Sequence, residues 1–522
     1  MVDKSAKAFI HPFLFGIYPV LFLYSHNIYD TYLSQLSAPL IFILTITIFL
    51  IIALRFITKN NAKTGIILSF FYLLFFSYRS IFNLIRELDD GPNVDIIIFF
   101  VEIILLGTGI FFIVRSKSSF RILTGFLNVF SITLISFSLF NIAIFAITHS
   151  NDNENSVVNN QIEIQDSLNP EMLPNIYHLV LDAYGREDVL KELYNYDNSD
   201  FTNYLESKGF YVAQKSAANY SQTYLSLGSM FNLNYLEEVL PWITSESRDK
   251  HWWKYPIRDF RFFKIIKKFG YNIFAFSSGY IHTELLNADV YNNQVYMTEF
   301  DNLLFNTTLL VPLVSRGYKF YDQYSFHRKR ILGTFENLKD IPKFSSPTYI
   351  FAHIMSPHPP FVFDEHGNPR DAPWEFTTDD GSEYFQYPGT SREKYHEEYG
   401  NQLTYLNSEL KEIINSILAN PERPTIIIIQ GDHGPRSFLD WENIEKSNFK
   451  ETLSILNAYY FHDGNYEQLY ENISPVNSFR VIFKQYFDLD YELLDDRSYM
   501  STWNTPYDFI EYNQNDTNTS LF

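Results

Sequence analysis

Apolar residues form long runs in the first part of the chain and short runs in the rest. Five segments among residues 1–150 are almost continuously apolar, at about 9–25, 38–57, 64–85, 94–114 and 122–147. Most of them approach the ~20 residues that a helix needs to cross a bilayer. The first is shorter and contains two prolines, which also fits a cleaved signal peptide, but no small-residue cleavage site follows it. The pattern predicts a domain of five membrane-spanning helices over residues 1–148.

Basic residues in the short loops predict the orientation of these helices. Lys and Arg lie before the first segment, between the second and third, and between the fourth and fifth, whereas the loop at 86–95 reads RELDDG. The basic regions should be cytoplasmic, and an odd number of spans then places everything after His149 outside. We therefore expect a multi-pass protein of the inner or cell membrane with an extracytoplasmic domain. Glu102 lies in the middle of the fourth segment, and it faces either a lipid head-group or a neighbouring helix.

After the Asn-rich stretch 149–172, interpreted as a linker, the apolar runs become short and alternate with helix-like stretches. Strand-length runs are IYHLVLD, NIFAFSS, TYIFAHIM, TIIIIQG and ILNAYYF, and helices are expected at Arg392–Leu418 and Ser474–Phe487. This alternation predicts an α/β domain over 173–511 with a mostly parallel central sheet and helices on both faces. We expect Asp371–Thr390 to be a surface excursion and 512–522 a disordered tail.

Charge and cysteine content exclude several classes of protein. The whole chain carries −20, while residues 1–150 hold 10 basic and 7 acidic residues, so the remainder carries −23. An acidic second part argues against a nucleic-acid partner. The absence of cysteine excludes disulfides, thiolate metal sites and a cysteine nucleophile.

A candidate metal site follows the apolar run Thr425–Ile429, which is β-branched and reads as a buried strand. Asp432 and His433 come directly after it, between two glycines. A carboxylate and an imidazole are ligands for zinc or manganese, and ligands in open α/β sheets collect beyond the carboxyl ends of the strands. The pair taken alone also fits an ordinary polar loop.

Three other positions also fit either a structural or a functional role. Asp182 closes the run IYHLVLD as either a helix cap or a metal ligand. Thr223 lies where a loop enters a helix, and Ser221 is one candidate for the N-cap. Such a helix start suits a phosphate or sulfate, and the hydroxyls are either caps or a nucleophile. His358, in SPHPPF, either binds an oxyanion and protonates a leaving group or is a satisfied loop histidine.

The order of these four elements resembles the alkaline-phosphatase and sulfatase superfamily. It is most similar to the membrane-bound branch that contains lipoteichoic-acid synthases and lipid-A phosphoethanolamine transferases. The motifs that carry the resemblance are PNIYHLVLDAYGRED, YSQTYLSLGS, SPHPPF and GDHG. Two features depart from it: the first ligand is Asp rather than Glu, and no C/S-x-P-x-R signature surrounds the threonine, which argues against a formylglycine sulfatase.

The resemblance implies a role for each residue. Asp182, Thr223, Asp432 and His433 would hold one divalent metal ion, zinc or manganese, and Thr223 would be the covalent nucleophile, with Ser221 and Ser226 as alternatives. His358 and Arg186 would complete the catalytic set, and His282 and His353 could lie nearby.

The function implied is transfer of a phospho-alcohol group from a membrane lipid donor to an envelope glycan or lipid acceptor through a phospho-threonine. The alternatives are a phosphodiesterase or sulfuric-ester hydrolase of the same superfamily, and a non-enzymatic envelope scaffold. No obligate protein partner is evident.

Overall fold

A computed structural model of the chain describes residues 9–28, 31–86, 91, 93–148, 173–248, 260–318, 320–342, 344–419, 421 and 423–513. The chain forms two compact units. The first contains the N-terminal helices and the segment Met297–Asp322, and the second contains Asn155–Tyr296 and Gln323–Phe522. The linker expected at 149–172 lies outside the described residues.

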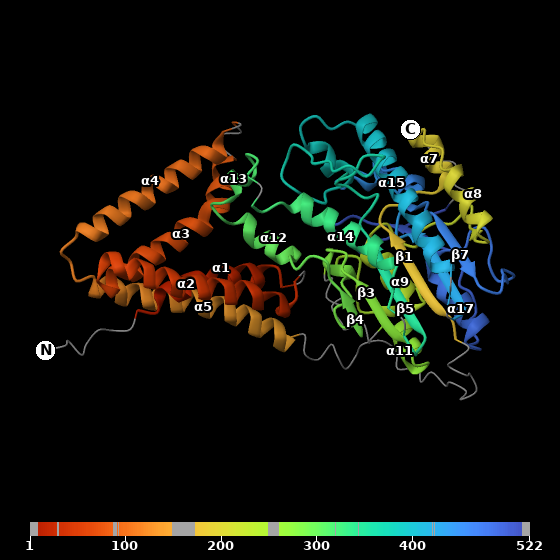
Figure 1. The fold of residues 1–522 in the computed structure, drawn as a ribbon, viewed down its shortest axis with the longest axis horizontal. Helices are drawn as coiled ribbons and strands as arrows, with labels where there is room; N and C mark the ends of the chain where they lie inside the picture. The colour runs from red at the N-terminus through yellow and green to blue at the C-terminus, as the bar shows by residue number, and fades with distance from the viewer. Residues whose placement is uncertain are drawn as a thin grey trace. The chain divides into compact units, whose positions relative to one another are not determined.

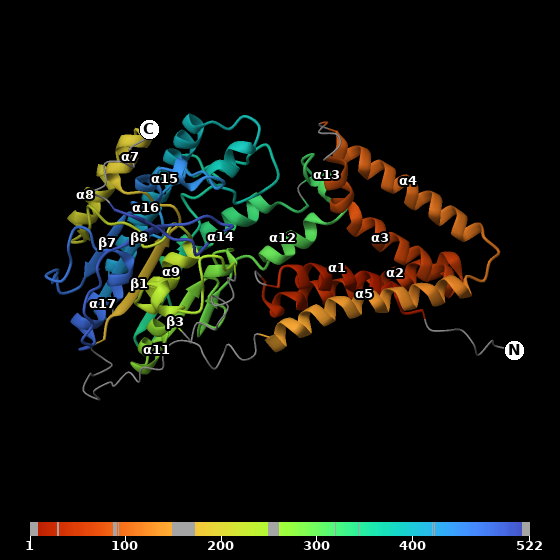
Figure 2. The same ribbon diagram turned by 180° about the vertical axis from the view of Figure 1, so that it is seen from behind.

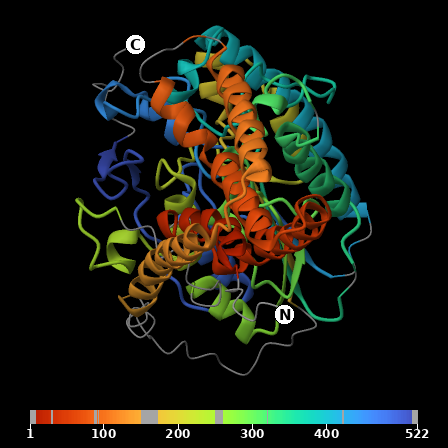
Figure 3. The same ribbon diagram turned by 90° about the vertical axis from the view of Figure 1, so that its left-hand side faces the viewer.

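Each of the five apolar segments forms one helix, shown in red to orange in Figure 3. The helices are α1 His11–His26, α2 Ser37–Thr58, α3 Asn61–Arg86, α4 Val94–Arg115 and α5 Arg121–Thr148, with a short 3₁₀ helix, η1 Leu33–Leu36, before α2. Within the described residues, 4 helices, α2 to α5, are long and apolar enough to cross a membrane. Helix α1 has 16 residues and contains Pro19, so the fifth span stays a prediction.

The starts of α1, α3 and α5 lie together at one end of the first unit. The backbone N–H of His11, at the start of α1, donates to Asn128 Oδ1 in α5 at 3.1 Å. Lys63 Nζ, at the start of α3, donates to the carbonyl of Val114 at the end of α4, at 2.7 Å. Helices α1, α3 and α5 therefore begin at the same end, as the basic-loop pattern requires.

The segment Met297–Asp322 packs with these helices, although it follows β4 of the α/β domain in sequence. It contains α12 Glu299–Asn306 and α13 Val311–Val314. The N–H of Leu309 donates to Phe75 O of α3 at 2.8 Å, and Arg316 pairs with Asp95 of α4 at 3.0 Å. Nothing in the sequence pattern indicated this insertion.

Glu102 is 2% exposed and shares one face of α4 with the buried residues Val94 and Ile98. Helix α4 packs against α3, so this buried face of α4 is turned toward α3. The inward-facing interpretation of Glu102 therefore holds.

The second unit is built on a sheet of 7 strands in the order β2-β7-β6-β1-β5-β3-β4. Strand β6 and the four strands after it in this order are parallel, while β7 and β2 are antiparallel additions. A separate antiparallel pair, β8-β9, completes the strands. The bounds are β1 Asn175–Leu181, β2 Tyr211–Val212, β3 Asn272–Phe276, β4 Val290–Asn292, β5 Thr348–Ile354, β6 Thr425–Gly431, β7 Asn457–Phe461, β8 Ser498–Met500 and β9 Ile510–Tyr512.

The mostly parallel sheet and all five strands expected from the sequence are confirmed. The tail was expected to begin at residue 512, but Tyr512 pairs with Ser498 in β9, so that boundary was wrong. Residues 514–522 lie outside the described residues.

Helices cover both faces of the sheet, as Figures 1 and 2 show. One layer contains α7 Glu187–Tyr194, α8 Ser199–Ser207, α14 Gln323–Leu338 and α15 Arg392–Ala419; the other contains α9 Thr223–Asn232, α10 Leu236–Val239, α11 Arg261–Lys268 and α17 Pro475–Tyr486. Short elements in the loops are η5 Ile281–Thr283, η6 Gly381–Gln386, η7 Ile444–Lys446 and α16 Phe449–Leu453. In β6 the even-numbered isoleucines pack on the second layer and the odd-numbered ones on the first, because side chains alternate along a strand.

The register of the three central strands positions the site. Leu181, the last residue of β1, pairs with Ile354 of β5 on one side and with Gly431 of β6 on the other. All three strands run in parallel and end at the same edge. The loops that carry the candidate residues therefore meet there.

Candidate active site

Two carboxylates and two imidazoles converge at the carboxyl edge of the sheet. His433 Nε2 lies 3.3 Å from Asp182 Oδ1 and 3.5 Å from Asp432 Oδ2. His353 Nε2, from β5, lies 3.3 Å from Asp182 Oδ2. All four side chains are buried. The structure thus brings Asp182, Asp432 and His433 together, and His353 joins them.

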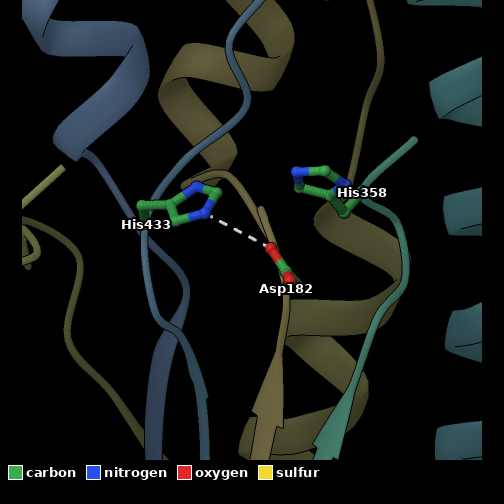
Figure 4. A group of neighbouring side chains, drawn as sticks. All are labelled: Asp182, His358 and His433. Carbon is green, nitrogen blue, oxygen red and sulfur yellow. Dashed lines mark ion pairs between the residues drawn. The ribbon is translucent and has the colours of Figure 1, made fainter. Parts of the chain in front are cut away.

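Figure 4 shows Asp182 between two imidazoles, His433 on the loop after β6 and His358 on the loop after β5. The Nδ1 of His433 donates to the carbonyl of Gly434 at 2.8 Å, and the Nδ1 of His358 donates to that of Pro359 at 2.6 Å. A carbonyl can only accept, so Nδ1 carries the proton in each neutral ring. The Nε2 lone pairs are then free for a cation.

The cluster fits a divalent metal ion. Four of its buried atoms have no hydrogen-bond partner: Asp182 Oδ1, Asp432 Oδ2, His353 Nε2 and His433 Nε2. In two groups, Asp182 with His358 and His433, and Asp182 with His353 and Asp432, the possible ligand atoms all lie within 4.8 Å of one another. Buried polar atoms without partners are rare, and nitrogen and carboxylate ligands of this kind suit zinc.

The charges in the cluster depend on one another. Burial raises the pKa of Asp182, but the neighbouring imidazoles of His358, His353 and His433 outweigh this effect and hold that pKa well below its ordinary value. Burial lowers the pKa of His353, but the carboxylates of Asp182 and Asp432 reverse this and raise it. A cation that binds here replaces protons, which makes its affinity dependent on pH.

Thr223 is the first residue of α9, is 7% exposed and lines a cavity next to the cluster. The N-cap is Gln222 and not the candidate Ser221. The Ser221 hydroxyl instead donates to Ser501 O at 3.3 Å and accepts from Ser501 N at 3.2 Å. Neither Ser221 nor Ser226 lines the cavity, so of the three possible nucleophiles the geometry favours Thr223.

The cavity has a volume of about 290 Å³ and combines acidic, basic and aromatic side chains. Its walls are formed by Asp182, Gln222, Thr223, Tyr280, Met355, His358, Thr378, Asp379, Asp380, Glu383, Arg436, Trp441 and Trp503. His358 Nε2 lies 3.4 Å from Asp380 Oδ2. Burial, and after it the charges of Asp379 and Asp380, raise the pKa of Glu383.

Three of these acids come from the segment Asp371–Thr390, which was expected to be a surface excursion. Asp380 is 3% exposed and accepts a hydrogen bond from Tyr395 at 2.8 Å. Its middle part, from Thr378 to Glu383, therefore forms a wall of the cavity, while Asp371, Glu375 and Pro388 are exposed, as expected of a surface excursion. The run of acids TDDGSE was the signal that sequence analysis left unused.

Arg186 does not line the cavity. Its guanidinium pairs with Asp188 at 2.6 Å and donates to Ser216 O at 2.8 Å. The structure therefore gives no support to the catalytic role expected for it. The ring of His282 packs against that of Tyr224, with 5.2 Å between the ring centres, and His282 also lies outside the cavity lining.

The loop after β6 is fixed by one buried carboxylate, Glu451 of α16. It accepts hydrogen bonds from Tyr194 Oη at 2.6 Å, Ser437 N at 2.9 Å, Ser437 Oγ at 2.6 Å and Phe438 N at 2.8 Å. We call this set of contacts the Glu451 clamp. Burial raises the pKa of Glu451 to about 7, against the effect of these donors.

Solved structures with weak similarity include two kinds of enzyme. The C-terminal periplasmic domain of EptC from Escherichia coli matches at 11% identity and TM-score 0.42, over 69% of this chain and 96% of that one. The lipooligosaccharide phosphoethanolamine transferase A of Neisseria meningitidis matches at 12% and 0.38, over 91% and 94%. The putative sulfatase yidJ of Bacteroides fragilis matches at 11% and 0.34, over 66% and 84%.

No curated protein matches the chain in sequence. The model of the Sulfatase family matches residues 174–479, which is more than half of the chain and includes Asp182, Thr223, His358, Asp432 and His433. The chain therefore belongs to the Sulfatase family of enzymes.

Proposed function

We propose that this protein is a membrane-bound, metal-dependent transferase that moves a phospho-alcohol group from a phospholipid to an envelope glycan or lipid. The observation that carries the proposal is the buried Asp182–Asp432–His433 cluster next to Thr223, in a chain that begins with long apolar helices. A lipid donor accounts for the helices, because simple hydrolysis of a soluble ester needs no membrane domain.

Two residues of the cavity, Thr223 and His358, have roles in the proposed reaction. Thr223 Oγ1 gives up its proton and forms a bond to phosphorus, the bond from phosphorus to the lipid alcohol breaks, and the alcohol takes up a proton. His358, which lines the same cavity, either accepts the threonine proton at its free Nε2 and passes it to the alcohol or, once protonated there, holds the phosphate oxygens. A hydroxyl of the acceptor then attacks the phospho-threonine and releases Thr223.

A divalent cation, zinc or manganese, held by Asp182, Thr223, Asp432 and His433, would lower the pKa of the threonine hydroxyl and offset the charge of the phosphate. The unpartnered atoms of Asp182, Asp432 and His433 support this ligand set. The same atoms argue against a non-enzymatic scaffold, because a scaffold would gain nothing from burying them without partners.

The helices support a topology with five spans and the Sulfatase-family domain outside the cytoplasm. Helices α1, α3 and α5 begin at the basic end, whereas the insertion Met297–Asp322 contacts the middle of α3 through Phe75 and the opposite end through Asp95, at the start of α4. With the basic end in the cytoplasm, the catalytic domain lies on the outer side with its insertion.

The experiment is transfer of label from a phospholipid with a labelled head-group phosphate. We expect the label on Thr223 of the wild type and its passage to a glycan or lipid acceptor, and no label on Thr223→Ala. The matched control is Ser226→Ala, which removes a buried hydroxyl one turn later in α9 that does not line the cavity. Label released only to water would show a phosphodiesterase, turnover of a sulfate ester alone would show a sulfuric-ester hydrolase, and full activity of Thr223→Ala would refute the covalent mechanism.

A further inference from the structure

One buried arginine in the cavity wall has no acidic partner. Arg436 lies on the loop that carries Asp432 and His433, is 6% exposed, and lines the cavity together with Gln222 and Thr223. Its Nη2 donates to the carbonyl of Ser221, and its guanidinium lies 5.4 Å from the ring centre of Trp441. Its Nε is buried without a hydrogen-bond partner, and no ion pair joins it to a carboxylate in the part of the chain that the structure describes.

Three other arginines of the same domain have partners for their guanidinium groups. Arg480, 7% exposed, donates through Nε and Nη2 to Leu233 O and through Nη1 to Glu492 O, and the other two pair with carboxylates. Arg186 pairs with Asp188 at 2.6 Å, and Arg328, 8% exposed, pairs with Asp371 at 2.5 Å. Burying a guanidinium without a counter-charge is costly, and arginine is seldom buried unless it is paired. A buried guanidinium with an unpartnered nitrogen, as in Arg436, suits a residue whose counter-charge is supplied by a bound ligand.

The loop holds Arg436 in a fixed position. The Glu451 clamp binds the two residues after it, Ser437 and Phe438, through three hydrogen bonds of 2.6 to 2.9 Å. Two residues before it, Gly434 N donates to Thr452 O at 2.7 Å. Fixing a binding group before the ligand arrives reduces the entropy lost on binding.

A second feature next to Arg436 favours an anion. Helix α9 has 10 residues and begins at Thr223, and its N-cap, Gln222, makes no capping bond with its side chain. The backbone N–H groups and the positive dipole at such a helix start attract negative charge. Arg436 and the helix start meet at Ser221, whose carbonyl accepts from Arg436 one residue before the N-cap.

We propose that Arg436, together with the start of α9, binds the oxyanion of the tetrahedral ester that enters the cavity. Two parallel N–H donors of a guanidinium match two oxygens of a phosphate or sulfate group. The inference rests on the proposed function in that the bound group is the one that Thr223 attacks. The resemblance placed Arg186, and not Arg436, in the catalytic set.

The test is binding of inorganic phosphate, and separately of inorganic sulfate, to the zinc-loaded full-length protein by titration calorimetry. Arg436→Gln should weaken binding by at least tenfold, and Arg436→Lys, which keeps the charge but not the fork, should weaken it less. Zinc content should stay at the wild-type level in both. The control is Arg392→Gln, which removes an arginine that stacks on Phe438 at 4.1 Å and donates to Ser437 O, outside the cavity lining.

Binding to Arg436→Gln within twofold of wild type would overturn the inference, as would an equal loss in Arg392→Gln. A phosphate-selective loss identifies a phosphate ester as the ligand, and a sulfate-selective loss identifies a sulfate ester. The proposed function fails separately: if phosphate binds through Arg436 but Thr223 never takes up label from a phospholipid, the anion site stands and the transferase does not.

Discussion

His433 Nε2 lies 3.3 Å from Asp182 Oδ1, although the two residues follow different strands, β6 and β1, from distant parts of the chain. The pairing of Leu181 with Gly431 brings the two side chains together, because Asp182 directly follows Leu181 and His433 lies two residues after Gly431. Neither atom has a hydrogen-bond partner. This contact is the centre of the proposed metal site.

Asp432→Asn should release the metal. Asp432 Oδ1 accepts from Ala183 N at 3.1 Å, which an amide oxygen can also do, so the loop should keep its fold while the charge is lost. Elemental analysis of the purified protein should give about one metal ion per wild-type chain and clearly less for the variant. Asp379→Asn, which changes an acid of the same cavity outside the cluster, is the control. A wild-type metal content in Asp432→Asn would contradict the ligand set.

Gly434→Ala should destabilise the domain. A Cβ at this position would lie 2.1 Å from Glu451 O and 2.7 Å from Ser454 O, both of which are backbone atoms that cannot rotate away. We expect a loss of about 1–3 kcal/mol or more in the free energy of unfolding, together with lost metal, because His433 is the neighbouring residue. Gly400→Ala, whose Cβ meets only the side chain of Tyr196 at 3.1 Å, should be much milder. Equal stability of the two variants would show that the loop can move.

Glu451→Gln should change how stability depends on pH. The folded state raises the pKa of Glu451 from 4.5 to about 7, so the folded protein holds this proton more tightly than the unfolded chain. The stabilisation is full below about pH 4.5 and is lost as the pH rises through about 7, by on the order of 3 kcal/mol. Gln mimics the protonated acid, so the variant should lose less stability than wild type over this interval.

The measurement is guanidinium unfolding of the full-length protein at several pH values, followed by tryptophan fluorescence. All 6 tryptophans fall between residues 242 and 503 of the sequence, after the N-terminal helices and outside the insertion Met297–Asp322, so the signal reports on the catalytic domain. Glu471→Gln, which changes a side chain that is 60% exposed, is the control. Identical pH dependence in wild type and Glu451→Gln would rule out Glu451 as the titrating group.

Single-cysteine variants should report the topology. The chain has no cysteine, so each introduced thiol is the only one present. We expect Ser118→Cys, in the basic loop between α4 and α5, to be protected from a membrane-impermeant maleimide in intact cells, and Ser167→Cys, in the expected linker, to react. The opposite pattern would place the catalytic domain in the cytoplasm and remove the argument for a lipid donor on the outer face.

The sequence by itself determined the elements whose signals are local. Apolar runs predicted the five N-terminal helices, and strand-length runs such as Thr425–Ile429 predicted the parallel core of the sheet, because burial on both faces demands continuous apolar residues. The positions of Asp182, Asp432 and His433 at strand ends were also readable, since parallel strands deliver their carboxyl ends to one edge.

Only the tertiary structure decided which side chains face the cavity. Arg186 and Arg436 both lie a few residues after a proposed metal ligand. Arg186 forms an ion pair with Asp188, whereas Arg436 has no carboxylate partner among the described residues. Asp380 became part of the wall, and Met297–Asp322 packed with the helices of the other unit. These outcomes depend on contacts between residues far apart in the chain, and a local pattern of apolar and polar positions carries no information about such partners.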